Sequence, residues 1–353
     1  MSSSRNRSIA AHIIPECEAS LQTPDWQQSL SSAFTDLPSL LKYLQLDDGK
    51  SPGTEQAMQD FSLRVPRVFA ALMQPGDVHD PLLRQVLPLA EEMSPIAGFT
   101  GNPVGDKESE ACPGLLHKYQ GRALIVATGA CAVHCRYCFR RHYAYSNGSA
   151  SPRQWMRILD YLRNHNEIEE VILSGGDPLM VNDERLADWL EQLESLPQIK
   201  RLRLHTRLPV VLPQRIGPQL IGLLTRGRIE TVIVIHANHP NELSPQVAEA
   251  MGQLKAAGIT LLNQSVLLKG VNDHAETLIK LSERLFSVGV LPYYLHLLDR
   301  VAGAAHFEVE AARALEIQQA LRARLPGYLV PRMVREIAGA LSKIPVYPAD
   351  EDG

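Results

Sequence analysis

The sequence predicts an α/β fold, an open barrel of parallel strands and helices that follows a helical N-terminal region. From Ala123 onward, short β-branched runs alternate with amphipathic stretches at intervals of about 30 residues, which is typical of βα units. Roughly the first 105 residues instead carry apolar side chains at helical spacing. Six units are too few to close an eight-stranded barrel, so we expect a partial (βα)6 barrel, with a doubly wound sheet as the alternative.

The order of the elements follows from this alternation. The N-terminal region, residues 1–105, is expected to hold helices at 26–44, 56–73 and 81–93, separated by turn-forming residues at 48–53 and 75–80. In the barrel, residues 106–353, strands are expected at 123–128, 170–174, 201–206, 230–235, 260–267 and 291–297. Helices are expected at 152–165, 183–196, 214–225, 245–257, 275–288 and 309–324. In either fold the active site should lie at the carboxyl ends of the strands.

Composition and charge exclude several classes of partner. The 353 residues include 35 Lys and Arg against 39 Asp and Glu, so there is no net positive charge for binding a nucleic acid. No segment reaches the roughly 20 uninterrupted apolar residues of a membrane span. The stretch Met1–Pro15 lacks the apolar core of a signal peptide, so a cytoplasmic location is expected.

Three of the five cysteines fall within one short loop, Cys131, Cys135 and Cys138, directly after the first predicted strand. Three thiolates in one loop can each bind one iron of a four-iron cluster and leave the fourth iron without a protein ligand. A zinc knuckle or a set of buried thiols is the alternative. The position at a strand's carboxyl end favours a cofactor.

The spacing Cys-x3-Cys-x2-Cys, with Tyr137 before the last cysteine, resembles the radical S-adenosylmethionine superfamily. A second segment at the end of the next strand resembles the glycine motif of that superfamily and contains Ser174, Gly175, Gly176 and Asp177. The resemblance implies a 4Fe-4S cluster on the three cysteines. It also implies cleavage of S-adenosylmethionine to a 5′-deoxyadenosyl radical.

Further segments resemble one family within this superfamily, the lysine 2,3-aminomutases, over nearly the whole chain. The segments lie at 65–67, 80–85, 113–119, 138–141, 208–215, 236–240, 263–273, 292–294 and 343–346. The chain most resembles the short bacterial branch that makes β-lysine for attachment to elongation factor P. The resemblance implies an isomerase that converts L-lysine to β-lysine and takes electrons from a flavodoxin or ferredoxin.

The resemblance also implies a role for individual residues. Pyridoxal 5′-phosphate would be attached to Lys343, with its phosphate near Lys118 and Arg122 and its ring near His296, where the family has a tyrosine. The residues implied for S-adenosylmethionine are Tyr137, Ser174, Gly175, Gly176, Asp177, His236 and Gln264. The residues implied for lysine are Arg140 for its carboxylate and Asp299 and Glu336 for its distal ammonium.

The chain departs from the family at several positions. Of the glycine run before the pyridoxal lysine only Gly339 is present, and Glu336 is one methylene longer than the usual aspartate, which bears on the enantiomer formed. No cysteine follows Cys138, so the structural zinc of longer members is not expected. Another radical aminomutase, a radical enzyme without pyridoxal, and a non-catalytic iron–sulfur or zinc-binding module remain the alternatives.

Overall fold

The N-terminal region is a set of short helices. The structure, a computed structural model, describes residues 26–46, 53–145 and 150–347. Here the helices are α1 (Trp26–Ser31), α2 (Leu37–Tyr43), α3 (Gln56–Asp60), α4 (Arg67–Ala70), α5 (Pro81–Arg84) and the 3-10 turn η1 (Ala90–Met93).

Each of the three long helices expected in this region is divided in two. Proline accounts for each break, because it lacks a backbone N–H and disfavours helical backbone at the residue before it. Pro38 lies in the first turn of α2, Pro66 is the N-cap of α4, and Pro88 lies between α5 and η1. The expected break at 75–80 separates α4 from α5. Of the expected break at 48–53 only Gly53 can be compared, because residues 47–52 lie outside the described residues.

The barrel is one sheet of ten strands in sequential order. Its parallel part consists of β3 (Arg122–Thr128), β4 (Glu170–Gly175), β5 (Arg201–Thr206), β6 (Glu230–Ile235), β7 (Thr260–Val266), β8 (Leu291–His296) and β9 (Arg332–Arg335). Antiparallel strands flank it, β1 (Glu110–Cys112) and β2 (Leu115–Tyr119) at one end and β10 (Ile344–Pro345) at the other. The strand order never reverses, which confirms the partial barrel and excludes the doubly wound alternative.

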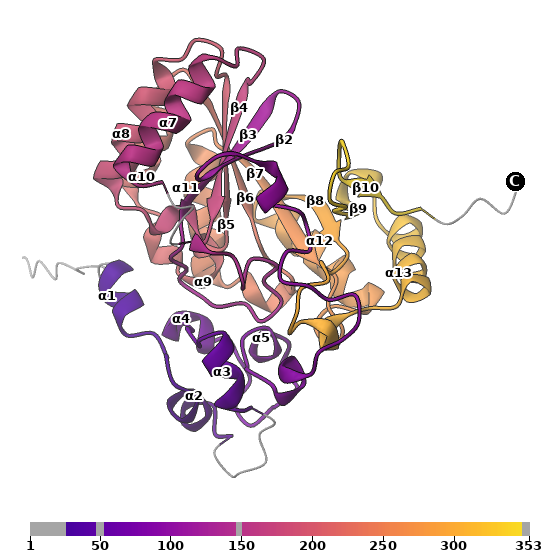
Figure 1. Cartoon of the computed structure of the whole chain (residues 1–353). Helices are drawn as coiled ribbons and strands as arrows, with labels where there is room; N and C mark the ends of the chain where they lie inside the picture. Colours follow the sequence, from indigo (N-terminus) through magenta and orange to yellow (C-terminus); the bar gives the residue numbers. More distant parts are fainter. Residues whose placement is uncertain (1–25, 47–52, 146–149, 348–353) are drawn as a thin grey trace, which may run out of the picture.

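Helices cover the outer face of the sheet (Figure 1). They are α7 (Pro152–Arg163), α8 (Asp183–Glu194), α9 (Leu208–Val211), α10 (Pro218–Thr225), α11 (Pro245–Ala256), α12 (Ala275–Ser287) and α13 (Ala311–Arg324). Shorter 3-10 turns are η2 (Lys107–Ser109), η3 (Pro178–Met180), η4 (Pro213–Arg215), η5 (Pro240–Glu242), η6 (Ala305–Phe307) and η7 (Gly327–Leu329). The helix expected from residue 214 starts only at Pro218, because Gly217 adopts an extended conformation as its N-cap.

The two faces of the sheet differ in chemistry because side chains alternate along a strand. In β5, Leu202 and Leu204 are buried in the apolar core shared with the helices. Arg203 and His205 point to the opposite face and line a cavity of about 440 Å³. The other strands contribute both polar and apolar side chains to this cavity, among them Arg122 and Leu124 of β3, Ser174 and Ile172 of β4, and Gln264 and Val266 of β7.

A buried ion pair joins the N-terminal region to the barrel. Arg136 donates to Glu92 at 2.6 Å, and both side chains are fully buried. The same guanidinium donates to the Phe61 and Ala57 carbonyls. The boundary between domains at residues 105 and 106 stays a prediction. Among the described helices, none is long and apolar enough to cross a membrane.

Candidate active site

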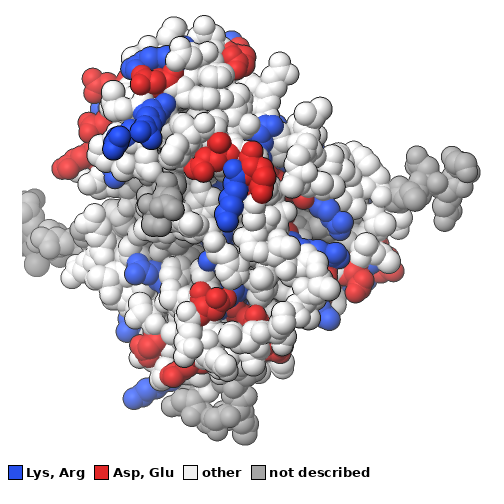
Figure 2. All heavy atoms as spheres, viewed as in Figure 1, with Lys and Arg blue, Asp and Glu red and all other residues white. Residues whose placement is uncertain are grey.

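Every site residue predicted from the sequence lines one cavity on the concave face of the barrel. At the carboxyl ends of the parallel strands, residues of the β3–α7 and β4–η3 loops line this cavity. Acidic and basic side chains are interspersed over the face of the molecule in Figure 2, and neither sign dominates it.

The three cysteines lie in the loop after β3. Cys131, Cys135 and Cys138 are free thiols, and the loop turns tightly, since the Cys138 N–H donates to the Cys135 carbonyl at 3.0 Å. No three described His, Cys, Asp or Glu side chains converge closely enough to hold a single metal ion. Three unpaired thiols on one loop, open to one cavity, fit a polynuclear cluster, which spaces its ligands over several irons.

Glycines hold the loop after β4 close to the cysteine loop. Gly175 has φ +115°, and a Cβ there would lie 2.7 Å from the Thr128 carbonyl oxygen. A Cβ on Gly176 would collide with the Ala130 carbonyl. The two loops can therefore approach this closely only with glycine at both positions.

Asp177 holds neighbouring loops in place. Its carboxylate accepts hydrogen bonds from Thr206 Oγ1 at 2.7 Å and from the backbone N–H groups of Arg207 and Leu208 at 2.8 and 3.0 Å. It also accepts from the Leu179 N–H at 3.1 Å. Burial raises the pKa of Asp177 to about 6. This residue positions the end of β5.

Arg140 is fixed by a residue that the sequence did not suggest. Its Nε donates to Asp106 Oδ2 at 2.8 Å and its Nη1 donates to Ser174 Oγ at 3.1 Å. Lys118 Nζ lies 2.8 Å from the other Asp106 oxygen. Asp106 thus joins the residue assigned to the substrate carboxylate with one assigned to the pyridoxal phosphate.

Lys343 and Glu336 face each other across the β9–β10 turn and form an ion pair. Glu336 also accepts from Lys118 Nζ at 3.3 Å. The two lysines lower the pKa of Glu336 against the opposing effect of burial, so the carboxylate is ionised.

Asp299, just past β8, has no such cation. Among the described residues, no side chain donates a hydrogen bond to its carboxylate or lies within ion-pair distance of it. Burial, reinforced by the nearby Glu336 charge, raises the pKa of Asp299 to about 7. Asp299 is therefore a carboxyl group whose ionised form would be stabilised by a cation that enters the cavity.

Neutral histidines line the middle of the cavity. His236 Nε2 and Gln264 Nε2 lie 2.8 Å apart, and burial lowers the pKa of His236 to about 3. Burial likewise lowers the pKa of His296 to about 3, and its ring meets the Tyr294 ring edge-on at 5.5 Å. At the start of β3, the Arg122 guanidinium carbon lies 4.8 Å from the centre of the Tyr119 ring, over its face.

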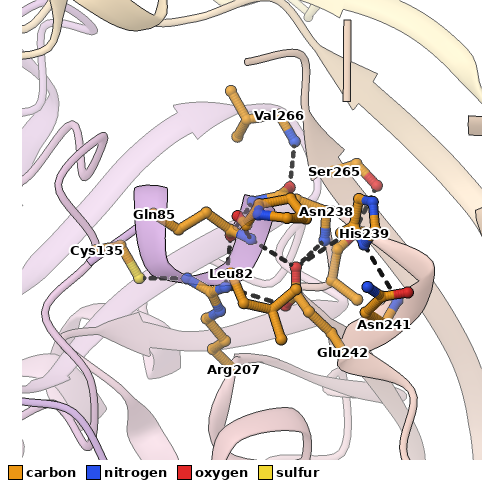
Figure 3. A network of polar contacts seen from close by, with 12 residues as sticks. Leu82, Gln85, Cys135, Arg207, Asn238, His239, Asn241, Glu242, Ser265 and Val266 are labelled. Atoms are coloured by element: carbon orange, nitrogen blue, oxygen red, sulfur yellow. Dashed lines mark hydrogen bonds and ion pairs between the residues drawn. The ribbon is translucent and has the colours of Figure 1, made fainter. Parts of the chain in front are cut away.

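Tyr137 belongs to a buried polar network that sequence reasoning did not assign. Its hydroxyl accepts from Arg207 Nη1 at 2.8 Å and from Asn238 Nδ2 at 2.7 Å. Gln85 accepts from Arg207 and Asn238 (Figure 3). Gln85 and Asn238 lie inside the segments shared with the family, and Arg207 directly precedes one, which is the signal that could have found them.

An open parallel barrel with a Cys-x3-Cys-x2-Cys loop at its mouth defines the radical S-adenosylmethionine class, and the profile of the Radical SAM superfamily matches residues 125–282. The chain is 47% identical over 331 residues to the L-lysine 2,3-aminomutase of Haemophilus influenzae, covering 94% of this chain and 98% of that protein. It is 47% identical over 341 residues to that of Escherichia coli, covering 95% and 98%. The L-lysine 2,3-aminomutase of Clostridium subterminale is 34% identical over 92% of this chain and 78% of its own length.

The chain belongs to the L-lysine 2,3-aminomutase family, which confirms the resemblance stated above. Membership implies a 4Fe-4S cluster, S-adenosylmethionine and pyridoxal 5′-phosphate as cofactors, and an isomerase as the class of enzyme. A radical SAM methyltransferase from Sphaerobacter thermophilus matches at TM-score 0.45 and 16% identity, over 63% of this chain and 68% of that one.

Proposed function

We propose that this protein converts L-lysine to β-lysine with a 4Fe-4S cluster, S-adenosylmethionine and pyridoxal 5′-phosphate. The observation that supports this most is the position of Lys343, which faces the same cavity as Cys131, Cys135 and Cys138. A lysine amine for the pyridoxal and three thiols for the cluster thus share one enclosed space. When bound, the cluster and S-adenosylmethionine supply a deoxyadenosyl radical and the pyridoxal supports nitrogen migration between neighbouring carbons.

The protein's own residues orient these groups and exclude water. Tyr137, His236 and Gln264 are proposed contacts of S-adenosylmethionine, and the low pKa of His236 keeps its ring neutral beside a sulfonium cation. Lys118 and Arg122 are proposed to bind the pyridoxal phosphate, and His296 to face its ring. Fixed orientation of the reacting atoms and exclusion of water are the protein's main contributions to such chemistry.

Charge in the cavity supports lysine as the substrate. Arg140, held by Asp106, is a guanidinium suited to a carboxylate. Asp299 and Glu336 are two carboxyl groups that line the same cavity, and in their ionised forms they would bind a distal ammonium and repel a distal carboxylate. Glutamate is therefore disfavoured as a substrate.

The test of this function is turnover by anaerobically reconstituted protein supplied with lysine, S-adenosylmethionine, pyridoxal 5′-phosphate and a reductant. We expect β-lysine, with the enantiomer assigned by chiral chromatography, and iron and sulfide at one four-iron cluster per chain. Changing Cys135 to Ala should abolish the cluster and the product together. Full iron content in that variant, or no β-lysine from loaded wild-type protein, would overturn the proposal.

Substrate selection is tested through the two carboxylates. Asp299→Asn and Glu336→Gln should each lower kcat/KM for lysine by about 30-fold to several thousand-fold, because the bound ammonium loses a buried partner. Cluster and pyridoxal content should stay at wild-type levels. Asp160→Asn, on the exposed face of α7, is the control and should leave kcat/KM unchanged. Wild-type turnover by both cavity variants would remove the assignment of lysine.

The pyridoxal site is tested separately at Lys343. Lys343→Ala should lose the pyridoxal absorbance that borohydride reduction fixes to the chain, and should keep its iron, because the two sites lie on separate segments. Peptide mapping after borohydride should find the label on Lys343 in the wild-type protein. A label on Lys118, the other cavity lysine, would move the attachment site.

We also propose that the β-lysine serves elongation factor P in the cytoplasm, and that a flavodoxin or ferredoxin supplies the electron. This proposal rests on the resemblance of the sequence to the short bacterial branch of the family, and the chain covers 98% of the length of the Haemophilus influenzae and Escherichia coli relatives. Elongation factor P purified from cells with and without a functional Lys343 should differ by one lysyl addition in its mass. Equal masses would contradict this role.

A further inference from the structure

Arg207 places a buried cation against one of the three cysteines. Its Nη1 lies 2.7 Å from Cys135 Sγ and donates a hydrogen bond to it (Figure 3). The other terminal nitrogen, Nη2, donates to Gln85 Oε1 at 2.6 Å and to Glu242 Oε2 at 3.0 Å. The side chain is 6% exposed, so water screens these interactions little.

The fold fixes Arg207 from several directions. Its backbone N–H donates to Asp177, which sets the residue at the end of β5 as the N-cap of α9. Its guanidinium carbon lies 5.7 Å from the centre of the Tyr137 ring and 5.4 Å from that of Phe69. Both terminal nitrogens of the guanidinium are hydrogen-bonded, and these bonds fix its orientation with Nη1 toward the sulfur.

Glu242 is a separate and equally fixed charge. Its Oε1 accepts from the backbone N–H groups of Asn238 and His239 and from Gln85 Nε2, at 2.9, 3.0 and 3.0 Å. Its carboxylate therefore keeps three donors even without the arginine. The pair Arg207 and Glu242 thus presents its positive end to the cysteine and its negative end away from it.

Hydrogen bonds to cluster sulfurs and nearby net charge set the reduction potential of an iron–sulfur cluster. In the reducing step the cluster gains one electron, passing from the 2+ to the 1+ state, and a one-electron donor of the flavodoxin or ferredoxin class is oxidised. No bond forms or breaks, and no proton moves. The added negative charge spreads onto the cysteine sulfurs, where an N–H donor and a cation stabilise it.

We propose that Arg207 raises the reduction potential of the cluster through its hydrogen bond to Cys135, and that Glu242 limits the increase. This rests on the proposed function, because it requires the cluster on Cys131, Cys135 and Cys138. It makes Arg207 a positioning and tuning residue. Neither Arg207 nor Glu242 contacts the lysine site assigned to Asp299 and Glu336.

The two charges give the proposal its test, because their removal has opposite effects. In a mediated redox titration followed by the electron paramagnetic resonance signal of the reduced cluster, Arg207→Gln should lower the ratio of reduced to oxidised cluster at a fixed potential at least tenfold. For a one-electron couple this is a shift of about 59 mV to lower potential. Glu242→Gln should shift the potential in the opposite direction, because the cation is then unopposed.

Arg207→Lys keeps the charge and loses the forked geometry, so its shift should be smaller than that of Arg207→Gln. Arg215→Gln is the matched control, because Arg215 is also a buried arginine paired with an aspartate, Asp183, and it does not contact the cysteines. It should leave the potential unchanged. Iron, sulfide and melting temperature are measured for every variant.

The possible results distinguish a failure of the tuning proposal from a failure of the proposed function as a cluster-containing enzyme. Wild-type protein that binds no four-iron cluster contradicts the proposed function and removes the basis for the tuning. Loaded Arg207→Gln with an unchanged potential overturns the tuning alone. If Arg207→Gln fails to hold iron, Arg207→Lys and Glu242→Gln carry the test, and shifts of the same sign in these two variants overturn it.

Discussion

Asp299 shows how the cavity changes the chemistry of a single side chain. Burial raises its pKa to about 7, against an ordinary value near 4. Between these two pH values the folded chain keeps a proton at Asp299 that the unfolded chain releases. The unfolded chain binds fewer protons, so this residue lowers the free energy of unfolding as the pH rises from about 4 to 7.

Asp299→Asn should therefore become more stable relative to the wild type as the pH rises through this window. The difference in unfolding free energy should grow by at most about 1.4 kcal/mol per pH unit and level off above pH 7. Urea unfolding at pH 4.5, 6 and 7.5 measures it. Asp188→Asn, exposed on α8, is the control. Parallel curves for Asp299→Asn and the wild type would contradict a raised pKa.

For individual residues, the sequence predicted those that lie in motifs and missed the residues that hold them in place through hydrogen bonds and ion pairs. The cysteine spacing and the segment around Lys343 identify chemistry locally. Asp106 precedes Arg140 by 34 residues and lies in a loop without any motif. Arg207 is not distinguished from the other arginines by its local sequence, and only the folded barrel places it against Cys135. Such pairings exist only in the folded chain, so local patterns could not reveal them.

Among the elements, the contact between the β3 and β4 loops depends on glycine. Gly176→Ala should weaken it, because the new Cβ collides with the Ala130 carbonyl, which is backbone and cannot rotate away. We expect a loss of about 1–3 kcal/mol in unfolding free energy and weaker retention of iron by the cysteine loop. Thermal unfolding and iron analysis measure the two effects.

Gly222 provides the matched control for that substitution. It lies within α10, and a Cβ there meets nothing within 4 Å. Gly222→Ala should keep full iron content and gain about 0.5–1 kcal/mol, because alanine is favoured over glycine within a helix. Equal losses in both variants would show that the loop contact is not the cause.

Periodicity predicted the long elements well and the short ones poorly. The six expected strands agree with β3 to β8 within one residue at each end. The strands β1, β2, β9 and β10 were missed, because runs of two to five residues are too short to show an alternation. Their pairing is decided by the neighbouring strands, as for β9, which adds a seventh parallel strand beside β8.

For the whole molecule, the ion pair between Arg136 and Glu92 connects the N-terminal helices to the cysteine loop. Arg141 Nη2 also lies 2.9 Å from Glu92 Oε2, so this buried carboxylate forms ion pairs with two guanidinium groups. Glu92→Gln should cost about 3–5 kcal/mol, because it removes the buried counter-charge and leaves only Asp60, 3.7 Å from Arg141 and half exposed, to face the two guanidinium groups. Amide hydrogen exchange should rise across residues 56–93 in the variant.

Asp160→Asn breaks an exposed ion pair with Arg163 on α7 and serves as the comparison. Its effect on the free energy of unfolding should be less than about 1 kcal/mol. A Glu92→Gln variant that unfolds like the wild type would show that the N-terminal helices are held by apolar packing alone. The alternation of strands and helices predicted the barrel, whereas this connection depends on side chains distant in sequence.

The open barrel has two free ends, and side chains join them across the cavity. Lys118, on β2 near one end, reaches Glu336, just past β9 near the other, and no hydrogen-bonded strand pair among the described residues bridges these ends. The two ends of the sheet are thus linked by this ion pair. A bound phosphate would compete for Lys118, and a bound ammonium would compete for Glu336. The ion pair between the two ends of the sheet would then be replaced by ion pairs to the bound molecules, and these molecules would connect the ends of the open barrel.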